Sequence, residues 1–157
     1  MKLTLLVVGK TDERFMKEGI ELYKRRLKHY VDFNIEIVPD IKKTKSLSPD
    51  QQRQKEGERI LSKWASGKEF HLFDEKGVLH SSRSFAGFLE KKMLSGMKEL
   101  VLVIGGPYGF SPQVEEKAVS RISLSRMTFS HQLARLLCVE QIYRAFTILK
   151  GESYHHD

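Results

Sequence analysis

Short apolar runs alternate along this chain with segments in which apolar residues recur every three or four positions. The runs, which predict buried or half-buried strands, occupy residues 3–8, 33–37, 69–73, 100–104 and 122–124. The periodic segments, which predict amphipathic helices, occupy residues 12–30, 48–64, 82–95, 111–120 and 131–150. Strand therefore precedes helix five times, a pattern typical of an α/β domain whose mostly parallel sheet is flanked by helices on both faces.

Several of the predicted helix ends carry local signals. The S-x-x-Q box at residues 48–51, with proline at the first helical position, predicts a capped helix start. Thr11 or Asp12 is placed to cap the first helix, and Gly151 to end the last one.

The last predicted helix is apolar around nearly its whole circumference, from Leu133 to Leu149. A helix of this kind is buried on all sides. We therefore expect the sheet to cover one side and a second copy of the chain to cover the other, which predicts a homodimer. Glu140, Arg144 and Thr147 fall close together on this helix, and they predict either an ordinary ion pair or a ligand site.

Length and composition predict one domain spanning residues 1–157, because 40% of the 157 residues are apolar. The single cysteine, Cys138, excludes an intramolecular disulfide and a multi-cysteine zinc site, and it fits a reducing compartment. The first apolar run is shorter than a signal-peptide core, and no segment approaches the roughly 18 apolar residues of a membrane span. We expect a cytoplasmic protein with no membrane partner.

Charge adds a hint about partners. Lysine and arginine outnumber acidic residues by 27 to 20, which gives a net charge of +7. This balance is typical of nucleic-acid-binding domains, but it also occurs in proteins that are merely basic. The basic positions that would form an RNA-facing surface are Lys24, Arg25, Arg26, Lys28 and His29, then Lys42, Lys43 and Lys45, and finally Arg121, Arg126, Arg135 and Arg144.

Three loops should meet where a ligand binds, because ligands of open parallel sheets lie beyond the carboxyl ends of the strands. They are residues 73–77, 105–109 and 125–131. The glycine loop, G-G-P-Y-G, lacks both common phosphate-binding patterns, and Pro107 removes a backbone donor. It therefore suits a neutral or cationic part of a ligand, or it is simply a tight turn. In the third loop, apolar side chains among small polar ones would sandwich an aromatic base.

Five segments together resemble one family. They are the start M-K-L-T-L-L-V-V-G-K, the loop L-V-I-G-G-P-Y-G-F-S, the segment L-S-R-M-T-F-S-H-Q, the helix V-E-Q-I-Y-R-A-F and the terminal G-E-S-Y-H. The chain is similar over its full length to the pseudouridine N3-methyltransferases of the SPOUT class. The resemblance implies a C-terminal trefoil knot, a homodimer and S-adenosyl-L-methionine bound in the knot. It also implies methylation of N3 of a pseudouridine in helix 69 of the 23S rRNA, on the assembled ribosome and without a metal.

The resemblance also assigns residues to the cofactor. An apolar contact to adenine would come from Phe73, where many relatives have leucine, and the glycine-loop position corresponds to Gly106. The cofactor loop corresponds to Ser125, Arg126, Met127, Thr128, Phe129 and Ser130. Ser130 departs from the family pattern, because relatives usually have proline there.

Five further residues match family positions tied to substrate handling: His131, Glu140, Arg144, Tyr154 and His155. His155 or His131 would take the proton that leaves N3. Arg144 would hold a phosphate or neutralise a developing uracil anion. Tyr154 would position the base from a tail that orders only when RNA is bound.

Other functions fit the sequence less well. The chain contains no H-E-x-x-H, G-x-S-x-G or C-x-x-C motif, which argues against a metalloprotease, a hydrolase and a redox enzyme. A small-molecule enzyme that uses a nucleotide would need a phosphate-binding loop, which Pro107 and the missing lysine disfavour. An RNA-binding module without catalysis and a SPOUT methyltransferase with another RNA target remain alternatives.

Overall fold

The computed structural model describes residues 1–156, and over that range strands and helices alternate as the sequence predicts. The strands are β1 (Lys2–Val8), β2 (Asp32–Val38), β3 (Lys68–Leu79), β4 (Glu99–Ile104) and β5 (Ser120–Ser123). The helices are α1 (Arg14–Leu27), α2 (Pro49–Leu61), α3 (Ser82–Leu94), α4 (Pro112–Lys117) and α5 (His131–Leu149). A short 3-10 turn, Thr44–Ser46, lies in the connector before α2.

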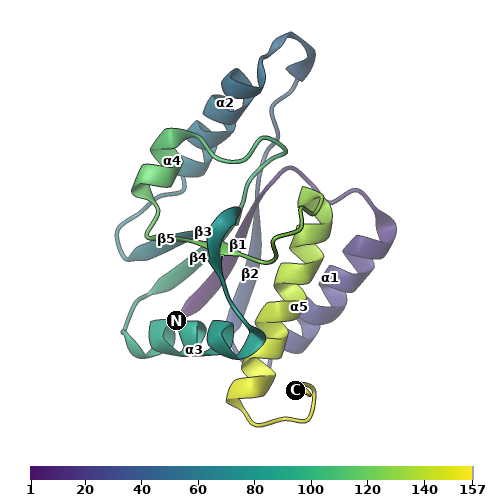
Figure 1. Cartoon of the computed structure of the whole chain (residues 1–157), viewed down its shortest axis with the longest axis vertical. Coiled ribbons are helices and arrows are strands. Elements are labelled where there is room, and N and C mark those ends of the chain that lie inside the picture. Colours follow the sequence, from purple (N-terminus) through teal and green to yellow (C-terminus); the bar gives the residue numbers. More distant parts are fainter. Residues whose placement is uncertain (157) are drawn as a thin grey trace.

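The strands form one sheet in the order β2-β1-β4-β3-β5, and every pairing within it is parallel. All carboxyl ends therefore lie along one edge of the sheet. The side chains of β1 alternate between two cores: Leu3 and Leu5 face α1, α3 and α5, whereas Leu6 faces α2 and α4. Figure 1 shows the two sets of helices on opposite sides of the sheet. The predicted α/β class, with helices on both faces, is confirmed.

β3 differs most from its predicted length, which was residues 69–73. It continues to Leu79, with a shift of register against β5 between Phe73 and Val78. The intervening polar residues bulge out of the sheet. Gly77 is needed there, because a Cβ at this position would lie 2.6 Å from backbone atoms of β5.

Two expected caps have different outcomes. The box formed by Ser48 and Gln51 is present at the start of α2, as predicted. The expectation that Thr11 or Asp12 caps α1 is wrong, because the residue before the helix is Glu13 and it makes no side-chain cap. Asp12 instead exchanges hydrogen bonds with Gln132 at the start of α5.

Arg135 does not belong to an RNA-facing surface, contrary to the sequence-based expectation. It is 1% exposed, and its guanidinium donates to the carbonyl oxygens of Val8 and Gly9 and to Thr11 Oγ1. The cause is the path of α5, which crosses the carboxyl end of β1 and meets the carbonyls that the strand leaves there.

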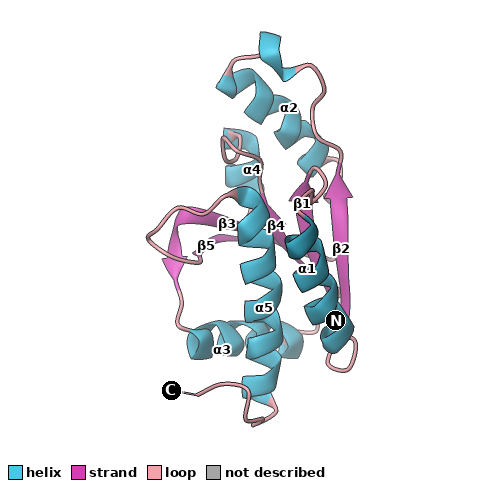
Figure 2. Cartoon of the chain, turned by 90° about the vertical axis from the view of Figure 1, so that its right-hand side faces the viewer, coloured by secondary structure: helices cyan, strands magenta, loops and turns pink. Residues whose placement is uncertain are grey.

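α5 is only partly covered within one chain. It lies against α1 and α3 (Figure 2), and its inner residues, such as Cys138 and Ile142, are fully buried. Its outer apolar residues, among them Leu133 and Leu137, keep partial exposure, whereas Leu136 packs against Gly19 of α1. Within residues 1–156, no helix combines the length and the apolar composition needed to cross a bilayer.

Candidate active site

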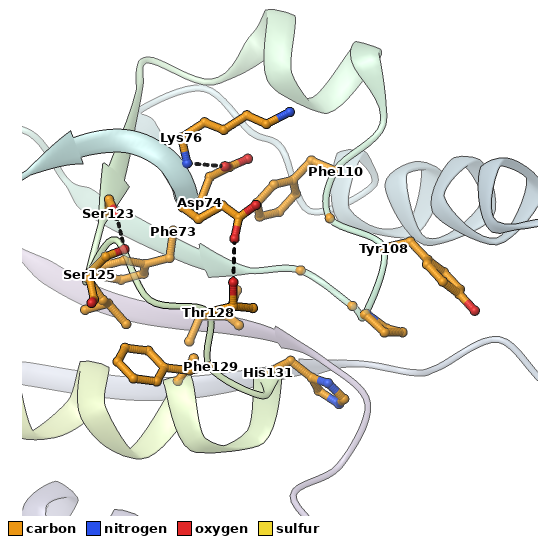
Figure 3. Close-up of a pocket in the computed structure, with 18 of the residues that line it drawn as sticks. Phe73, Asp74, Lys76, Tyr108, Phe110, Ser123, Ser125, Thr128, Phe129 and His131 are labelled. Carbon is orange, nitrogen blue, oxygen red and sulfur yellow. Dashed lines mark hydrogen bonds between the residues drawn. The ribbon is translucent and has the colours of Figure 1, made fainter.

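A cavity of about 430 Å³ lies at the carboxyl edge of the sheet, where three loops were expected to meet. Its walls are residues 73–76, residues 104–110 and residues 123–129 except Arg126, and His131 and Ala134 at the start of α5 also line it. Figure 3 shows these side chains gathered around one space. The volume lies within the range of small-molecule and cofactor sites.

The walls of this cavity combine apolar faces with charged groups. Phe73, Leu124 and Phe129 supply apolar surface, while Asp74 and Glu75 bring carboxylates. Lys76 and Arg53 add positive charge among the lining residues. Such a cavity can hold a ligand with an aromatic base at one end and a polar or charged portion at the other.

Hydrogen bonds hold the third loop in place over the cavity. Thr128 Oγ1 donates to Glu75 Oε2 at 2.9 Å, which ties this loop to the bulge of β3 (Figure 3). Ser125 accepts twice, at its hydroxyl from the Met127 amide at 2.9 Å and at its carbonyl from the Ser123 hydroxyl at 2.8 Å. The loop is therefore pre-organised by its own small polar residues.

The glycine loop forms a tight turn and also lines the cavity, so the prediction of a tight turn and the prediction of a ligand-site loop are compatible. The Gly109 amide donates to the Gly106 carbonyl at 3.2 Å, and Gly109 has a φ of +76°, which a glycine adopts without strain. At Gly106 the constraint is space, because a Cβ there would lie 2.4 Å from Glu56 Oε2.

Most residues expected to bind the cofactor line this cavity. They are Phe73, Gly106, Ser125, Met127, Thr128 and Phe129. Arg126 and Ser130 do not: Arg126 is exposed, and Ser130 caps α5 by accepting the Leu133 amide at 3.2 Å. Serine at this position thus supplies a cap that proline lacks. Sequence reasoning missed Arg53, because no local signal shows that α2 reaches this cavity.

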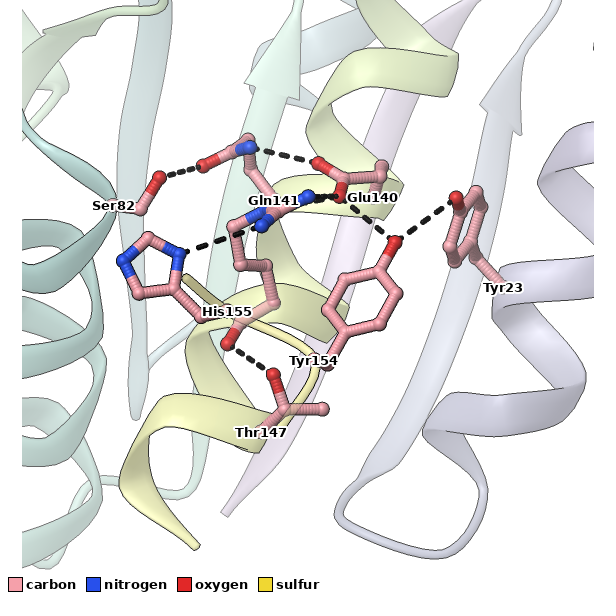
Figure 4. Close-up of polar contacts among 8 residues, drawn as sticks. Tyr23, Ser82, Glu140, Gln141, Thr147, Tyr154 and His155 are labelled. Atoms are coloured by element: carbon pink, nitrogen blue, oxygen red, sulfur yellow. Dashed lines mark hydrogen bonds and ion pairs between the residues drawn. The ribbon is translucent and has the colours of Figure 1, made fainter. Parts of the chain in front are cut away.

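A second group of predicted residues forms a separate polar cluster near the end of α5 (Figure 4). Arg144 donates to Glu140 Oε1 from Nη2 at 2.6 Å and from Nε at 3.0 Å. Tyr154 donates to the same oxygen at 3.1 Å, and its hydroxyl lies 3.2 Å from that of Tyr23. A longer contact of 3.4 Å joins Arg144 Nη1 to Nδ1 of His155.

The contacts of this cluster position the tail against α5 and affect the protonation of Tyr154. Burial raises the pKa of Tyr154, and the hydrogen bond to Tyr23 and the charge of Glu140 raise it further. The phenol is therefore neutral near pH 7 and keeps its proton as a donor. The Arg144 guanidinium lies over its ring, 4.8 Å from the centroid. Through these contacts Tyr154 and His155 lie against α5.

The cluster and the cavity occupy different parts of α5. Glu140 follows His131 by nine positions and Arg144 follows it by thirteen, which corresponds to about 14 Å and 20 Å along the helix axis. The structure therefore brings together Glu140, Arg144, Tyr154 and His155, but it leaves His131 with the cavity. A smaller neighbouring cavity of about 340 Å³ shares Phe73, Ser123 and Leu124 with the first and is lined by Gln141 on the side of α5.

His131 has the electrostatics of a neutral imidazole. Burial lowers its pKa, and the positive charge of Arg135, one helical turn away, lowers it further. A neutral ring nitrogen is able to accept a proton at pH 7. Among residues 1–156, no group of three or more His, Cys, Asp or Glu side chains is arranged to hold a metal ion.

Known proteins resemble this chain over its whole length. "Ribosomal RNA large subunit methyltransferase H" of Porphyromonas gingivalis is 54% identical over 157 residues, which is 100% of both chains. The protein of the same name from Christiangramia forsetii is 53% identical over 156 residues, or 99% of both.

A solved structure shares the fold of this chain, and a family model matches its sequence. A probable methylase family protein from Haemophilus influenzae Rd KW20 has a similar fold, with a TM-score of 0.52 and 13% identity, over 99% of this chain and 70% of the other. Residues 1–155 match the family described as "Predicted SPOUT methyltransferase". With a family match of this extent and relatives above 50% identity, the chain belongs to the SPOUT methyltransferase family.

Proposed function

We propose that this protein transfers a methyl group from S-adenosyl-L-methionine to the 23S rRNA of the large ribosomal subunit. The acceptor is N3 of a pseudouridine in helix 69, on the assembled ribosome in the cytoplasm. One observation carries the proposal: the loops that the family resemblance assigns to the methyl donor line one cavity, at the carboxyl edge of a parallel sheet. The names of the full-length relatives support an rRNA substrate.

The cavity residues fit this donor. Phe73, Leu124 and Phe129 offer apolar faces for an adenine ring, and the glycine loop lets a ligand approach backbone atoms closely. The carboxylates of Asp74 and Glu75 can accept from ribose hydroxyls or from the ammonium of the methionine portion. When bound, the donor supplies a methyl group that its sulfonium already activates, so the protein mainly has to align two reactants.

The protein must also remove a proton. When the N3–methyl bond forms, the proton on N3 leaves, and an imidazole nitrogen is the natural acceptor near neutral pH. His131 lines the cavity with a lowered pKa, and His155 is the second candidate, in the cluster around Arg144. The Arg144 guanidinium can neutralise charge that develops on the base, and the protonated Tyr154 hydroxyl can donate to it.

We propose further that the working unit is a homodimer in which the site is completed across the interface. The partly exposed apolar side of α5 needs a cover, and a two-fold contact is the simplest one for identical chains. If two α5 helices cross in an antiparallel sense, the Arg144 cluster of one chain approaches the His131 end of the other. The C-terminal trefoil knot that the family implies belongs to the same proposal.

The basic side of α1 is proposed to face the RNA phosphates. Arg25 and Lys28 are exposed and Lys24 is partly exposed, whereas Arg26 lies over the rings of Tyr23 and Tyr143. Reversal of Lys24, Arg25 and Lys28 to glutamate should weaken ribosome binding at moderate salt. Unchanged binding would reject this surface.

The activity is tested with ribosomes from a strain that lacks the corresponding gene. Purified protein and S-adenosyl-L-methionine are added, and the 23S rRNA is mapped by mass spectrometry. A single new methyl group on the helix 69 pseudouridine supports the proposal. Methylation elsewhere supports a SPOUT enzyme with another target, and failure to bind the donor in calorimetry supports a non-catalytic RNA-binding module.

The shared site is tested by mixing two inactive homodimers, His131→Ala and Tyr154→Phe, under conditions that exchange subunits. In a composite site, each mixed dimer has one site that carries both substitutions and one that carries neither. Activity should therefore return to roughly half that of the wild type per mixed dimer. If both groups act within one chain, mixing restores nothing.

A further inference from the structure

A buried carboxylate lies directly behind the wall of the cavity. Glu56, on α2, is 2% exposed, and the space that a Cβ on Gly106 would take is filled by its carboxyl group, with Oε2 at 2.4 Å. Gly106 lines the cavity, so this carboxyl group lies directly behind a residue that faces the ligand space. Glu56 itself is not part of the cavity wall.

Glu56 lacks the partners that a buried carboxylate normally has. Gln52 Nε2 donates to Oε1 at 2.9 Å, while Oε2 has no hydrogen-bond partner among residues 1–156. Burial raises the pKa of Glu56 and the nearby Asp40 carboxylate adds to this, against the opposing hydrogen bond from Gln52, and no basic side chain in that range forms an ion pair with it. A buried acceptor left in this state is costly, and in native proteins it calls for a functional explanation.

The missing partner is a positive charge. Where water is excluded, two charges a few ångströms apart interact far more strongly than they do in solvent. Gly106 has no side chain to occupy the space that the Glu56 carboxyl group fills, so the electric field of this carboxylate reaches the cavity through the glycine backbone. A cation in the cavity would supply the compensation that the protein itself omits.

We propose that Glu56 is a specificity-determining residue that makes the cavity prefer a positively charged methyl donor over its neutral product. This inference rests on the proposed function. Transfer of the methyl group breaks its bond to sulfur, and the electron pair of that bond stays on sulfur. The sulfonium thereby becomes a neutral thioether, the favourable interaction with Glu56 disappears, and release of the product becomes easier.

A purely structural role is the competing explanation, because Glu56 also fills the space behind the glycine loop. Ser111 provides a matched control for it. Its hydroxyl is buried without a hydrogen-bond partner among the described residues, and it packs against Gly57 of the same helix, where a Cβ would lie 2.3 Å from Ser111 Oγ. Ser111→Ala therefore perturbs the same packing without removing a charge, and Ser111 does not line the cavity.

The test compares ligands of different charge by calorimetry on the intact dimer at pH 7.5. The ligands are S-adenosylmethionine, its neutral product S-adenosylhomocysteine, and sinefungin, which carries an ammonium in place of the sulfonium. Glu56→Gln keeps the shape and removes the charge. We expect the ratio of cation to product affinity to fall about tenfold for both cations, and to stay at the wild-type value in Ser111→Ala.

A second variant covers the case in which Glu56→Gln is poorly folded. Glu56→Asp keeps the charge on a shorter side chain, so it should preserve most of the ratio even if all affinities fall. If Glu56→Gln weakens all three ligands equally, or changes none, Glu56 only supports the loop and the inference is wrong. If the wild type binds none of the ligands, the proposed function itself fails, which is a different result.

Discussion

Replacement of Arg135 by methionine should destabilise the protein strongly, although the substitution removes a positive charge from a basic protein. Three acceptors depend on this side chain: the carbonyls of Val8 and Gly9, and Thr11 Oγ1. A buried carbonyl that loses its donor costs about 1–3 kcal/mol, so the two carbonyls together cost about 2–6 kcal/mol. Methionine avoids the desolvation of a guanidinium, which offsets part of this loss. We expect the free energy of unfolding to fall by about 3 kcal/mol.

The assay is urea unfolding at pH 7 and at one fixed protein concentration, because the midpoint of the homodimer that we propose would depend on concentration. Arg126→Met is the control: Arg126 is exposed, so its substitution should change the free energy of unfolding by less than about 0.5 kcal/mol. Arg135→Lys should give an intermediate loss, since one ammonium cannot span the acceptors of a planar guanidinium. A loss below about 1 kcal/mol for Arg135→Met would refute the role assigned to this side chain.

Burial opposes ionisation of Glu99, but hydrogen bonds from a threonine and a lysine outweigh it and hold its pKa below 4.5. Its carboxylate therefore stabilises the fold above about pH 4.5, and this contribution is lost as the pH falls through the lowered pKa. Glu99→Gln should unfold at lower urea than the wild type at pH 7, and the difference should shrink as the pH falls below 4.5. Gly106→Ala should abolish donor binding in calorimetry because its Cβ meets Glu56, and adding Glu56→Ala should restore part of the stability that Gly106→Ala loses, which a double-mutant cycle measures. Gly87→Ala, in the middle of α3 with nothing within 4 Å of the new Cβ, should raise the free energy of unfolding by about 0.5–1 kcal/mol.

The sequence predicts a structural feature correctly where the feature depends on residues within one segment or on the order of the strands. Apolar runs such as that of β4, which is buried at every position, are readable because a strand covered on both faces needs no polar residue. The meeting of three loops at one edge follows from the parallel order alone, and the cavity confirms it. The box at Ser48 and Gln51 is equally local, since both of its partners lie in one helical turn.

Contacts between distant segments could not be predicted in the same way. Arginine is usually a surface residue. The burial of Arg135 depends on where α5 crosses the end of β1, a strand that lies more than 120 positions earlier in the chain. The approach of Glu56 to Gly106 likewise depends on how α2 packs under a loop fifty residues later. Neither side chain is anomalous by type or by spacing. Only the fold makes the first a support for β1 and places the carboxyl group of the second behind Gly106, which lines the cavity.

The pattern of α5 shows how far a periodicity can be interpreted. A helical wheel gives the angle of each residue around the axis but not its position along it, so it places Glu140 beside Arg144 and is silent about their distance from His131. The structure adds the position along the axis: His131 lies at the start of α5, whereas Glu140 and Arg144 lie in its middle and second half. α5 is apolar on nearly all sides, and its polar groups include His131 at its start and the pair Glu140 and Arg144 further along. This composition is expected of a helix whose outer side belongs to an interface. In the proposed homodimer this separation within one chain would be removed, because two antiparallel copies of α5 would bring each cavity and the other chain's cluster together.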